Sequence, residues 1–255
     1  MINTTLFKKS SFFVDVNNVV TYTDLFLYNE LVCRMDNDTL LKDLFLDKIP
    51  KINSDKKLDR DLMMVQISAS KKNPNILLDW IDIDKFNSHN FKFSIEKFLA
   101  SLYYDFLCNP TCDEYLQFTE FGNTLKILLN DQNLVSLDLY IPFSSDFIIY
   151  NILDSLSGYN ILKVHIIVGN KKDYLLNNKY DTYIFENCSD IDEYLDNKNH
   201  GCEVIVPSYE YNMIEGRTDI DKIMEQVTYH RLYLKNDMRH YFDKNILINT
   251  ISVPI

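Results

Sequence analysis

The chain has 255 residues, of which 46% are hydrophobic and 25% charged, so it is long and apolar enough to bury a sizeable globular core. Its net charge of −11 disfavours stand-alone nucleic-acid binding, because proteins that neutralise phosphates carry clustered Lys and Arg. No apolar run reaches the length of a membrane span, and five scattered cysteines indicate reduced thiols in the cytoplasm rather than a disulfide framework.

Residues 1–61 are expected to form an N-terminal helical layer, and residues 62–206 the central sheet. Alternating apolar residues predict strands, and apolar residues at three- and four-residue spacing predict helices. By these patterns the elements of the first half are a strand at 11–16, helices at 24–35 and 40–49, strands at 62–68 and 75–81, a helix at 91–108, a strand at 115–121 and a helix at 124–129.

A strand–helix–strand unit within residues 134–168 is the clearest pattern in the chain. Apolar and polar residues alternate over 135–141, which is typical of a strand. Ser144 or Ser145 can accept a hydrogen bond from the free N–H groups of the helix that follows. The apolar run at 162–168 then predicts a second strand that is covered on both faces of the sheet.

The last third of the chain predicts more strands and a long helix. Residues 181–186 and 203–206 read as strands, with a short helix near 190–195 between them. Residues 207–255 are expected to be a C-terminal helix and tail, with the helix running from Thr218 to about His240. Together these elements predict one α/β domain, a mostly parallel sheet with flanking helices.

The distribution of glycine excludes several nucleotide sites. No glycine precedes Gly122, so the chain has no Walker A loop, no GxGxxG loop and no GxSxG elbow. A methyltransferase of this architecture would have a glycine-rich loop after its first central strand. We expect that position to be Ala69–Pro74, where side chains and a proline would fill the space of a cofactor. The hypothesis is a solvated loop and no bound cofactor, with an unorthodox cofactor loop as the alternative.

Two groups of residues could hold a metal ion, although a structural reading explains each as well. Cys108 and Cys112 have a spacing seen in zinc sites, but no second Cys/His pair lies in register with them. Asp79, Asp82 and Asp84 surround a tryptophan, and a solvated strand end accounts for them equally. We therefore assign no metal ligand and no catalytic residue.

The predicted C-terminal helix is the candidate for contact with a partner. It carries His230 and His240 among Tyr and Arg side chains, a composition enriched at protein interfaces. The residues expected to bind a partner are Tyr229, Tyr233 and Arg239.

Three stretches resemble the small, stimulatory subunit of the poxvirus mRNA-capping enzyme. They are residues 12–54 (FFVDVNNVVTYTDL through LLKDLFLDKIPKINS), 141–168 (IPFSSDFIIYNILDSLSGYNILKVHIIV) and 218–238 (TDIDKIMEQVTYHRLYLKNDM). The resemblance implies a Rossmann-like, methyltransferase-like fold that has lost cofactor binding. It also implies a heterodimer in which this chain, not itself an enzyme, stimulates the guanine-N7 methyltransferase of a larger catalytic subunit.

The amino-acid composition indicates the kind of genome that encodes the chain, and two other functions stay open. Only two alanines stand against many Asn, Ile, Lys and Tyr, which indicates an A/T-rich viral or plasmid genome and, for a virus, a location in the host cytoplasm or the virion. An active RNA methyltransferase and a viral assembly or structural protein stay open as alternatives. The stretch VDVNNVVTYTDL is also similar to the opening of acyl-adenylating enzymes, but residues 118–128 match their phosphate loop poorly.

Overall fold

The computed structural model divides the chain into two compact units that interleave along the sequence. It describes residues 10–52, 63, 66–67, 70–73, 75–112, 116–187, 190, 202–207 and 228–232. The sheet unit comprises residues 1–21, 118–144 and 152–255, and the helical unit comprises residues 22–117 and 145–151. The expectation that both belong to one domain concerns how the units pack together and stays a prediction.

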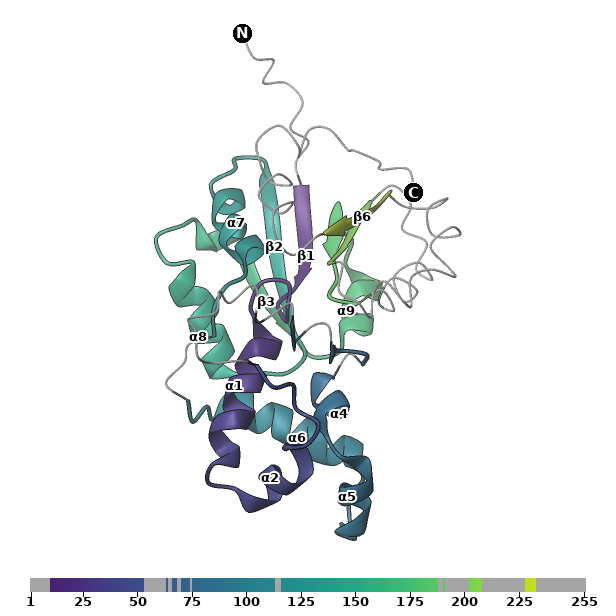
Figure 1. The fold of residues 1–255 in the computed structure, drawn as a ribbon. Helices are drawn as coiled ribbons and strands as arrows, with labels where there is room; N and C mark the ends of the chain where they lie inside the picture. The colour runs from purple at the N-terminus through teal and green to yellow at the C-terminus, as the bar shows by residue number, and fades with distance from the viewer. Residues whose placement is uncertain are drawn as a thin grey trace. The chain divides into compact units, whose positions relative to one another are not determined.

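The sheet unit contains six parallel strands in the order β3-β2-β1-β4-β5-β6 (Figure 1). The strands are β1 Ser10–Asp15, β2 Leu134–Ile141, β3 Val164–Val168, β4 Thr182–Ile184, β5 Glu203–Pro207 and β6 Thr228–Leu232. The order runs outward from β1 in both directions, so β1 and β4 lie at the centre. The predicted α/β class with a parallel sheet and flanking helices is confirmed.

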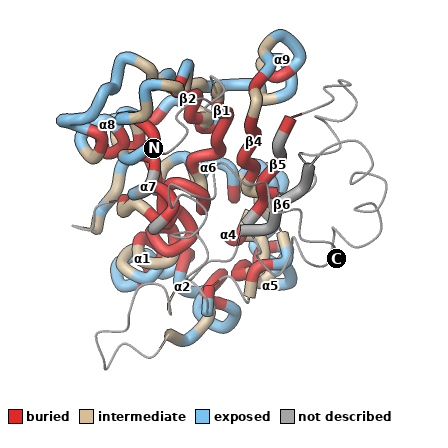
Figure 2. The backbone as a smooth tube through the Cα atoms, turned by 90° about the horizontal axis from the view of Figure 1, so that it is seen from above, coloured by how far each residue is buried: buried red, intermediate tan, exposed pale blue. Residues whose placement is uncertain are grey.

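Helices cover both faces of this sheet. Helix α7 (Glu120–Leu129) and helix α9 (Lys171–Asn177) lie on opposite sides of the strands, as the two views in Figures 1 and 2 show. Under α9, the sheet packs Phe13 against a cluster of apolar side chains from β4, β5 and α9. Burial on both faces explains why the middle of each strand is apolar: Phe12, Phe13 and Val14 in β1, and Val204, Ile205 and Val206 in β5.

The helical unit is built from short helices, and all of those described except the first begin at a polar cap. They are α1 Thr23–Met35, α2 Thr39–Phe45, α4 Ile76–Trp80, α5 Ile83–Ser88 and α6 Ile95–Cys108. Asp38, Asn75, Asp82 and Ser94 each accept a hydrogen bond from a free backbone N–H group in the first turn. Helix α8 (Asp146–Ser155) begins in the helical unit, where Ser145 caps it as predicted, and ends in the sheet unit.

Three strands predicted in the first half of the chain are wrong. Residues 75–81 contain helix α4, and the described residues of 62–68, which are 63, 66 and 67, are helical. Residues 116–119 contribute only an isolated bridge before α7 begins. The strand from the predicted N-terminal layer, β1, is instead the central strand of the sheet. An apolar run of four to eight residues fits a buried helix as well as a strand, which explains these errors.

The strand–helix–strand unit forms as predicted, with one difference in burial. Strand β2 pairs with the central strand β1, and the η1 turn (Ile161–Lys163) leads into β3 at the sheet edge. Val168 is 44% exposed, so the expectation of a strand covered on both faces is wrong. An edge strand has one neighbour only, and its apolar side chains are correspondingly less buried.

Candidate functional site

The carboxyl ends of β1 and β4 meet where the strand order changes direction. Strands β2 and β3 follow on one side of β1, while β4, β5 and β6 follow on the other. In parallel α/β sheets, ligands bind in the crevice outside the carboxyl ends of the strands at such a reversal. Asp15, the last residue of β1, lies at this position and is 3% exposed. We call the residues around it the switch-point cluster.

The switch-point cluster joins two carboxylates through one ammonium group. Lys171, at the start of α9, donates to Asp15 Oδ2 at 2.8 Å and to Asp190 Oδ2 at 2.7 Å. The backbone N–H of Glu186, just after β4, donates to the same Asp15 oxygen at 2.8 Å. The other oxygen, Asp15 Oδ1, is buried and has no hydrogen-bond partner among the residues that the structure describes. The central strand is therefore tied to α9 and to the segment after β4 through one carboxylate oxygen.

Burial changes the protonation chemistry of this cluster. Removal from water raises the pKa of Asp15 from 3.8 to about 7, against the lowering effect of Lys171, and the nearby carboxylate of Asp190 raises it further. For Lys171, burial opposes the charged form, but the carboxylates of Asp15 and Asp190 outweigh it and raise the pKa above its ordinary value. Burial therefore favours the protonated form of Asp15 more than it would be favoured in water, while Lys171 favours the ionised form.

The loop after β1 does without glycine because an asparagine takes the unusual backbone conformation. Asn18 has a φ of +54°, a region that Asn tolerates better than most residues. Its side-chain amide donates to Glu186 Oε1 at 2.6 Å, which closes this loop over the end of β4. The loop that corresponds to a cofactor loop therefore follows Asp15 at residues 16–21. The predicted position at Ala69–Pro74 is wrong, because β1 is the first central strand.

Helix α7 packs tightly against the same loop. Thr119 donates from Oγ1 to the carbonyl of Val19 at 2.6 Å and accepts from Gly122 N at 2.9 Å. A Cβ atom on Gly122 would lie 2.1 Å from the Val20 carbonyl oxygen, so only glycine fits there. Gly122 therefore allows α7 to approach the backbone of the loop at residues 16–21 closely.

A second polar cluster lies beneath α9, two residues farther than Asp15 from the carboxyl ends of the strands. Asp138 of β2 pairs with Phe13 on one side and with His165 on the other. Asp138 Oδ1 lies 2.8 Å from His165 Nδ1, and Asp138 Oδ2 accepts from the hydroxyl of Tyr174 at 2.7 Å and from that of Tyr180. Burial and the hydrogen bond to Asp138 raise the pKa of Tyr180, so its phenol stays protonated. Asp138 is buried, whereas the His165 side chain is 56% exposed.

The loop that was predicted to be solvated is packed into the helical unit. Lys71 is 2% exposed, and its ammonium group lies 2.8 Å from Asp24 Oδ2 in the first turn of α1. The backbone N–H groups of Lys72 and Asn73 donate to Asp79, and Trp80 donates from Nε1 to a serine hydroxyl in the same loop. The hypothesis of a solvated loop is therefore wrong: a buried ion pair and capping bonds fix these residues.

Three of the residues considered as metal ligands, Asp79, Asp82 and Cys112, have structural partners. Asp79 caps the loop just described, and Asp82 accepts from Lys85 N at the start of α5. Cys112 donates its thiol to the Asn29 carbonyl. Within the described ranges, no group of three or more His, Cys, Asp or Glu side chains is arranged to hold a metal ion.

Two of the three residues expected to bind a partner lie outside the described residues. These are Tyr233 and Arg239, whose contact with a partner stays a prediction. Tyr229 lies in β6, where it pairs with Val204 of β5, so residues 228–232 are a strand and not part of the predicted helix. The run Thr228–Leu232 has the β-branched and aromatic residues that favour strands.

Comparisons with known proteins leave the family open. No protein-family model matches the chain, and no curated protein is significantly similar to it. None of the helices in the described part of the chain is long and apolar enough to cross a membrane.

Proposed function

We propose that this chain is a non-catalytic regulatory subunit that binds and stimulates the guanine-N7 methyltransferase of an mRNA-capping enzyme. The strand order is the one found in doubly wound, Rossmann-like nucleotide-binding sheets, which fits a methyltransferase-like ancestry. The resemblance of residues 12–54, 141–168 and 218–238 to the stimulatory capping subunit supplies the partner and the pathway step.

The observation that carries the proposal is the sealed carboxyl end of β1. A dinucleotide or S-adenosylmethionine site needs open space and backbone N–H groups at this position. Here the buried carboxyl of Asp15 and the ammonium of Lys171 occupy it, and Asn18 and Glu186 close the adjoining loop. A cofactor would have to displace a buried ion pair, and separating such a pair costs about 3–5 kcal/mol. These residues do not fit S-adenosylmethionine, so no step of methyl transfer is assigned to this chain.

The surface charge supports a protein partner. A net charge of −11 favours encounter with a basic protein surface and disfavours a direct hold on RNA phosphates. A regulatory subunit of this kind acts by binding one conformation of its partner better than another. The stimulation is therefore expected to require a stable heterodimer.

Reconstitution with the catalytic capping subunit from the same source tests the proposal. Methyl transfer from S-adenosylmethionine to capped RNA is measured with the catalytic subunit alone, with this chain alone and with both. We expect no turnover by this chain, a raised rate with both proteins and co-elution of the two at equal stoichiometry. Turnover by this chain alone, or a mixture that neither co-elutes nor gains activity, would contradict the proposal.

One geometry favours the alternative of an active enzyme. Asp138 Oδ1 lies 2.8 Å from Nδ1 of His165, whose side chain is 56% exposed, and a carboxylate that orients a histidine in this way is a feature of general-base sites. If the chain were an RNA methyltransferase of this kind, it would turn over by itself and His165→Gln would abolish that turnover. The same variant should leave stimulation intact if the chain is a regulatory subunit.

A further inference from the structure

The switch-point cluster surrounds one ammonium group, that of Lys171, with contacts of two kinds. Nζ donates to two carboxylate oxygens, Asp15 Oδ2 at 2.8 Å and Asp190 Oδ2 at 2.7 Å. It also lies 4.9 Å from the centre of the Tyr140 ring and 5.5 Å from that of the Phe185 ring. Carboxylates together with aromatic faces are the groups that recognise an alkylammonium ion. The cluster therefore has the composition of an ammonium site, and the ammonium comes from the chain itself.

The groups around this ammonium are held in place and shielded from water. Asp15 and Phe185 are buried, and the side chain of Asp190 is 22% exposed. The hydroxyl of Tyr140 donates to the carbonyl of Gly169 at 2.7 Å, which fixes the position of the ring. Attraction between charges is stronger away from water, and groups that are already ordered lose little entropy when a ligand binds. The cluster is therefore pre-organised for a cation.

One acceptor of the cluster remains open among the described residues. Asp15 Oδ1 is buried and has no hydrogen-bond partner there. An ammonium group has three N–H donors, of which Lys171 directs two to the Oδ2 atoms of Asp15 and Asp190. A third donor directed at Asp15 Oδ1 would satisfy the last carboxylate oxygen of Asp15. The acceptors of the cluster thus match the donors of one ammonium ion in number.

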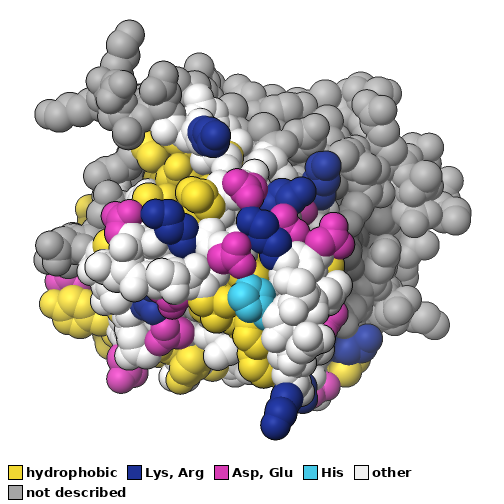
Figure 3. Space-filling model, turned by 60° about the horizontal axis from the view of Figure 1, so that its bottom comes forward, with side chains coloured by type: hydrophobic (Ala, Val, Ile, Leu, Met, Phe, Trp, Pro, Cys, Tyr) yellow, Lys and Arg dark blue, Asp and Glu magenta, His cyan; other side chains and the backbone are white. Residues whose placement is uncertain are grey.

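A surface lysine of the helical unit shows how an ordinary ion pair differs from this site. Nζ of Lys85 lies 2.8 Å from Asp47 Oδ2 and 3.6 Å from Asp43 Oδ1. The Lys85 side chain is 35% exposed and those of its two partners are 65% and 48% exposed, so water competes for the charges. Figure 3 shows acidic and basic side chains next to one another on the surface of the molecule. Lys85 also contacts two carboxylates, but outside a buried site, and is therefore the matched control.

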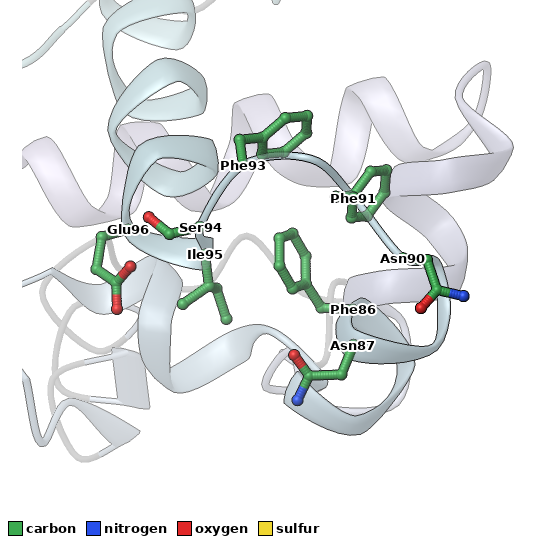
Figure 4. Close-up of a pocket in the computed structure, with 8 residues that line it drawn as sticks. All are labelled: Phe86, Asn87, Asn90, Phe91, Phe93, Ser94, Ile95 and Glu96. Atoms are coloured by element: carbon green, nitrogen blue, oxygen red, sulfur yellow. The ribbon is translucent and has the colours of Figure 1, made fainter.

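The pocket between α5 and the start of α6 has a different chemistry (Figure 4). Its volume is about 400 Å³, and the rings of Phe86, Phe91 and Phe93 lie around it. Among the described residues that line it there is one carboxylate, Glu96, and no lysine or arginine. The pocket therefore gives no indication of a ligand class, whereas Lys171 shows directly which group the switch-point cluster accepts.

We propose that the switch-point cluster is a binding site for an alkylammonium ion, and that Lys171 is a tethered ligand that fills it. Lys171 is the first residue of α9, so the filled site also fixes the start of α9 at the end of the central strand. A magnesium ion fits less well, because it takes six oxygen ligands and keeps several waters, which leaves no role for two ring faces. A guanidinium group is planar and forked, and suits a bidentate carboxylate better than two separate ones.

Removal of the tethered ligand tests the proposal. Lys171→Ala deletes three carbons and the ammonium nitrogen, which are the atoms of n-propylammonium, so this ion is the probe. The thermal midpoint of the full-length chain is measured against n-propylammonium chloride at constant chloride concentration. About pH 9 is suitable, because the amine is still protonated there and the ionised form of Asp15, whose pKa is about 7 in wild type, is favoured.

We expect a saturable rise in the midpoint of Lys171→Ala. For an ion of four non-hydrogen atoms a dissociation constant on the order of 10 mM is reasonable, and 100 mM then raises the midpoint by about 3–5 °C. Wild type, in which the site is filled, and Lys85→Ala should show no saturable rise. If Lys171→Ala is unfolded in buffer, the same ion should restore its far-UV circular dichroism.

Two further variants separate the site from a general effect of the amine. Lys171→Met fills the space with an uncharged chain and should not respond. Lys171→Ala combined with Asp15→Asn lacks one carboxylate, and the ion should bind it roughly tenfold more weakly or not at all.

Three results would overturn the proposal. The first is a Lys171→Ala chain that n-propylammonium neither stabilises nor refolds. The second is an equal response from Lys85→Ala, which would make the effect one of any exposed ion pair. The third is a larger response of Lys171→Ala to magnesium chloride at equal ionic strength, which would make the cluster a metal site.

Discussion

Glu30 in the helical unit and Asp15 in the sheet unit are both buried, but their carboxyl oxygens have very different sets of hydrogen-bond partners. In the helical unit both oxygens of Glu30 accept hydrogen bonds: Oε1 from the backbone N–H groups of Thr111 and Cys112 at 2.8 and 2.6 Å, and Oε2 from the Thr111 hydroxyl and Arg34 at 3.0 and 3.1 Å. In the described part of the sheet unit, Oδ2 of Asp15 accepts hydrogen bonds from Lys171 and Glu186 N, whereas Oδ1 has no partner.

The two carboxylates therefore have different roles. Glu30 connects two elements of the helical unit, whereas Asp15 lies at the position where parallel α/β sheets bind ligands. Glu30 ties α1 to the turn after α6, and Arg34 extends this clamp to the Asn109 carbonyl at 2.6 Å. Asp15 instead places a buried carboxyl group with few partners at the carboxyl end of β1, the place where parallel α/β sheets in general bind ligands. Sites that break the rule of full hydrogen bonding tend to be functional positions or their remnants.

Removal of the Glu30 carboxylate should have the largest effect. Glu30→Ala leaves the Thr111 and Cys112 N–H groups buried without an acceptor and strips Arg34 of a partner. We expect a loss of about 3–5 kcal/mol in the free energy of unfolding, measured by urea denaturation. Glu30→Gln keeps one acceptor oxygen and should lose clearly less. A loss below about 1 kcal/mol for Glu30→Ala would show that the clamp is not structural.

Removal of the Asp15 carboxyl group should change how the free energy of unfolding depends on pH. The pKa of Asp15 is 3.8 when unfolded and about 7 when folded, so the folded chain binds the extra proton between these values. Its stabilising contribution is complete below pH 4 and is lost as the pH rises through 7. The free energy of unfolding of wild type, minus that of Asp15→Asn, should therefore fall by about 2–4 kcal/mol from pH 4 to pH 8.

If the free energy of unfolding changed with pH in the same way for wild type and Asp15→Asn, the prediction for Asp15 would be wrong. The other charged groups that face Asp15 are Lys171 and Asp190, with Glu186 reaching it through its backbone. The two side chains are retained in the variant, so subtraction isolates Asp15.

A smaller effect on stability is expected at Asp138, a buried carboxylate with three side-chain partners. Tyr180→Phe removes one phenol donor from Asp138, which keeps Tyr174 and His165. We expect a loss of about 1–2 kcal/mol in the free energy of unfolding at pH 7, because one hydrogen bond to a charged group is lost. Tyr174→Phe should cost a similar amount. If either variant lost as much free energy of unfolding as Glu30→Ala, the remaining hydrogen bonds to Asp138 would not compensate for the lost one, contrary to this prediction.

Periodicity predicted the strands that repeat a clear pattern but not their position in the sheet. The alternation in β2 and the apolar run of β3 identified both strands, and Ser145 marked the helix between them. That β1 is central follows from pairings with β2 and β4, more than 100 residues away in sequence. Residues 75–81 were ambiguous by pattern, although Asn75 before the apolar run is a helix-cap signal.

The switch-point cluster could not be predicted because its members are distant in sequence. Asp15 and Lys171 are 156 residues apart, and only the fold brings them together. One signal was present: Asp15 and Asp138 each interrupt an apolar strand. Asp138 was read as part of the polar face of its strand, whereas α9 covers that face and buries it.

The central claim is that the chain's own side chains, Asp15 and Lys171 above all, fill the place of a cofactor. Calorimetric titration of the purified full-length chain with S-adenosylmethionine tests it most directly, with the catalytic capping subunit as the positive control. We predict no saturable heat for this chain and clear binding by the catalytic subunit. Stoichiometric binding to this chain with a dissociation constant in the micromolar range would contradict the account.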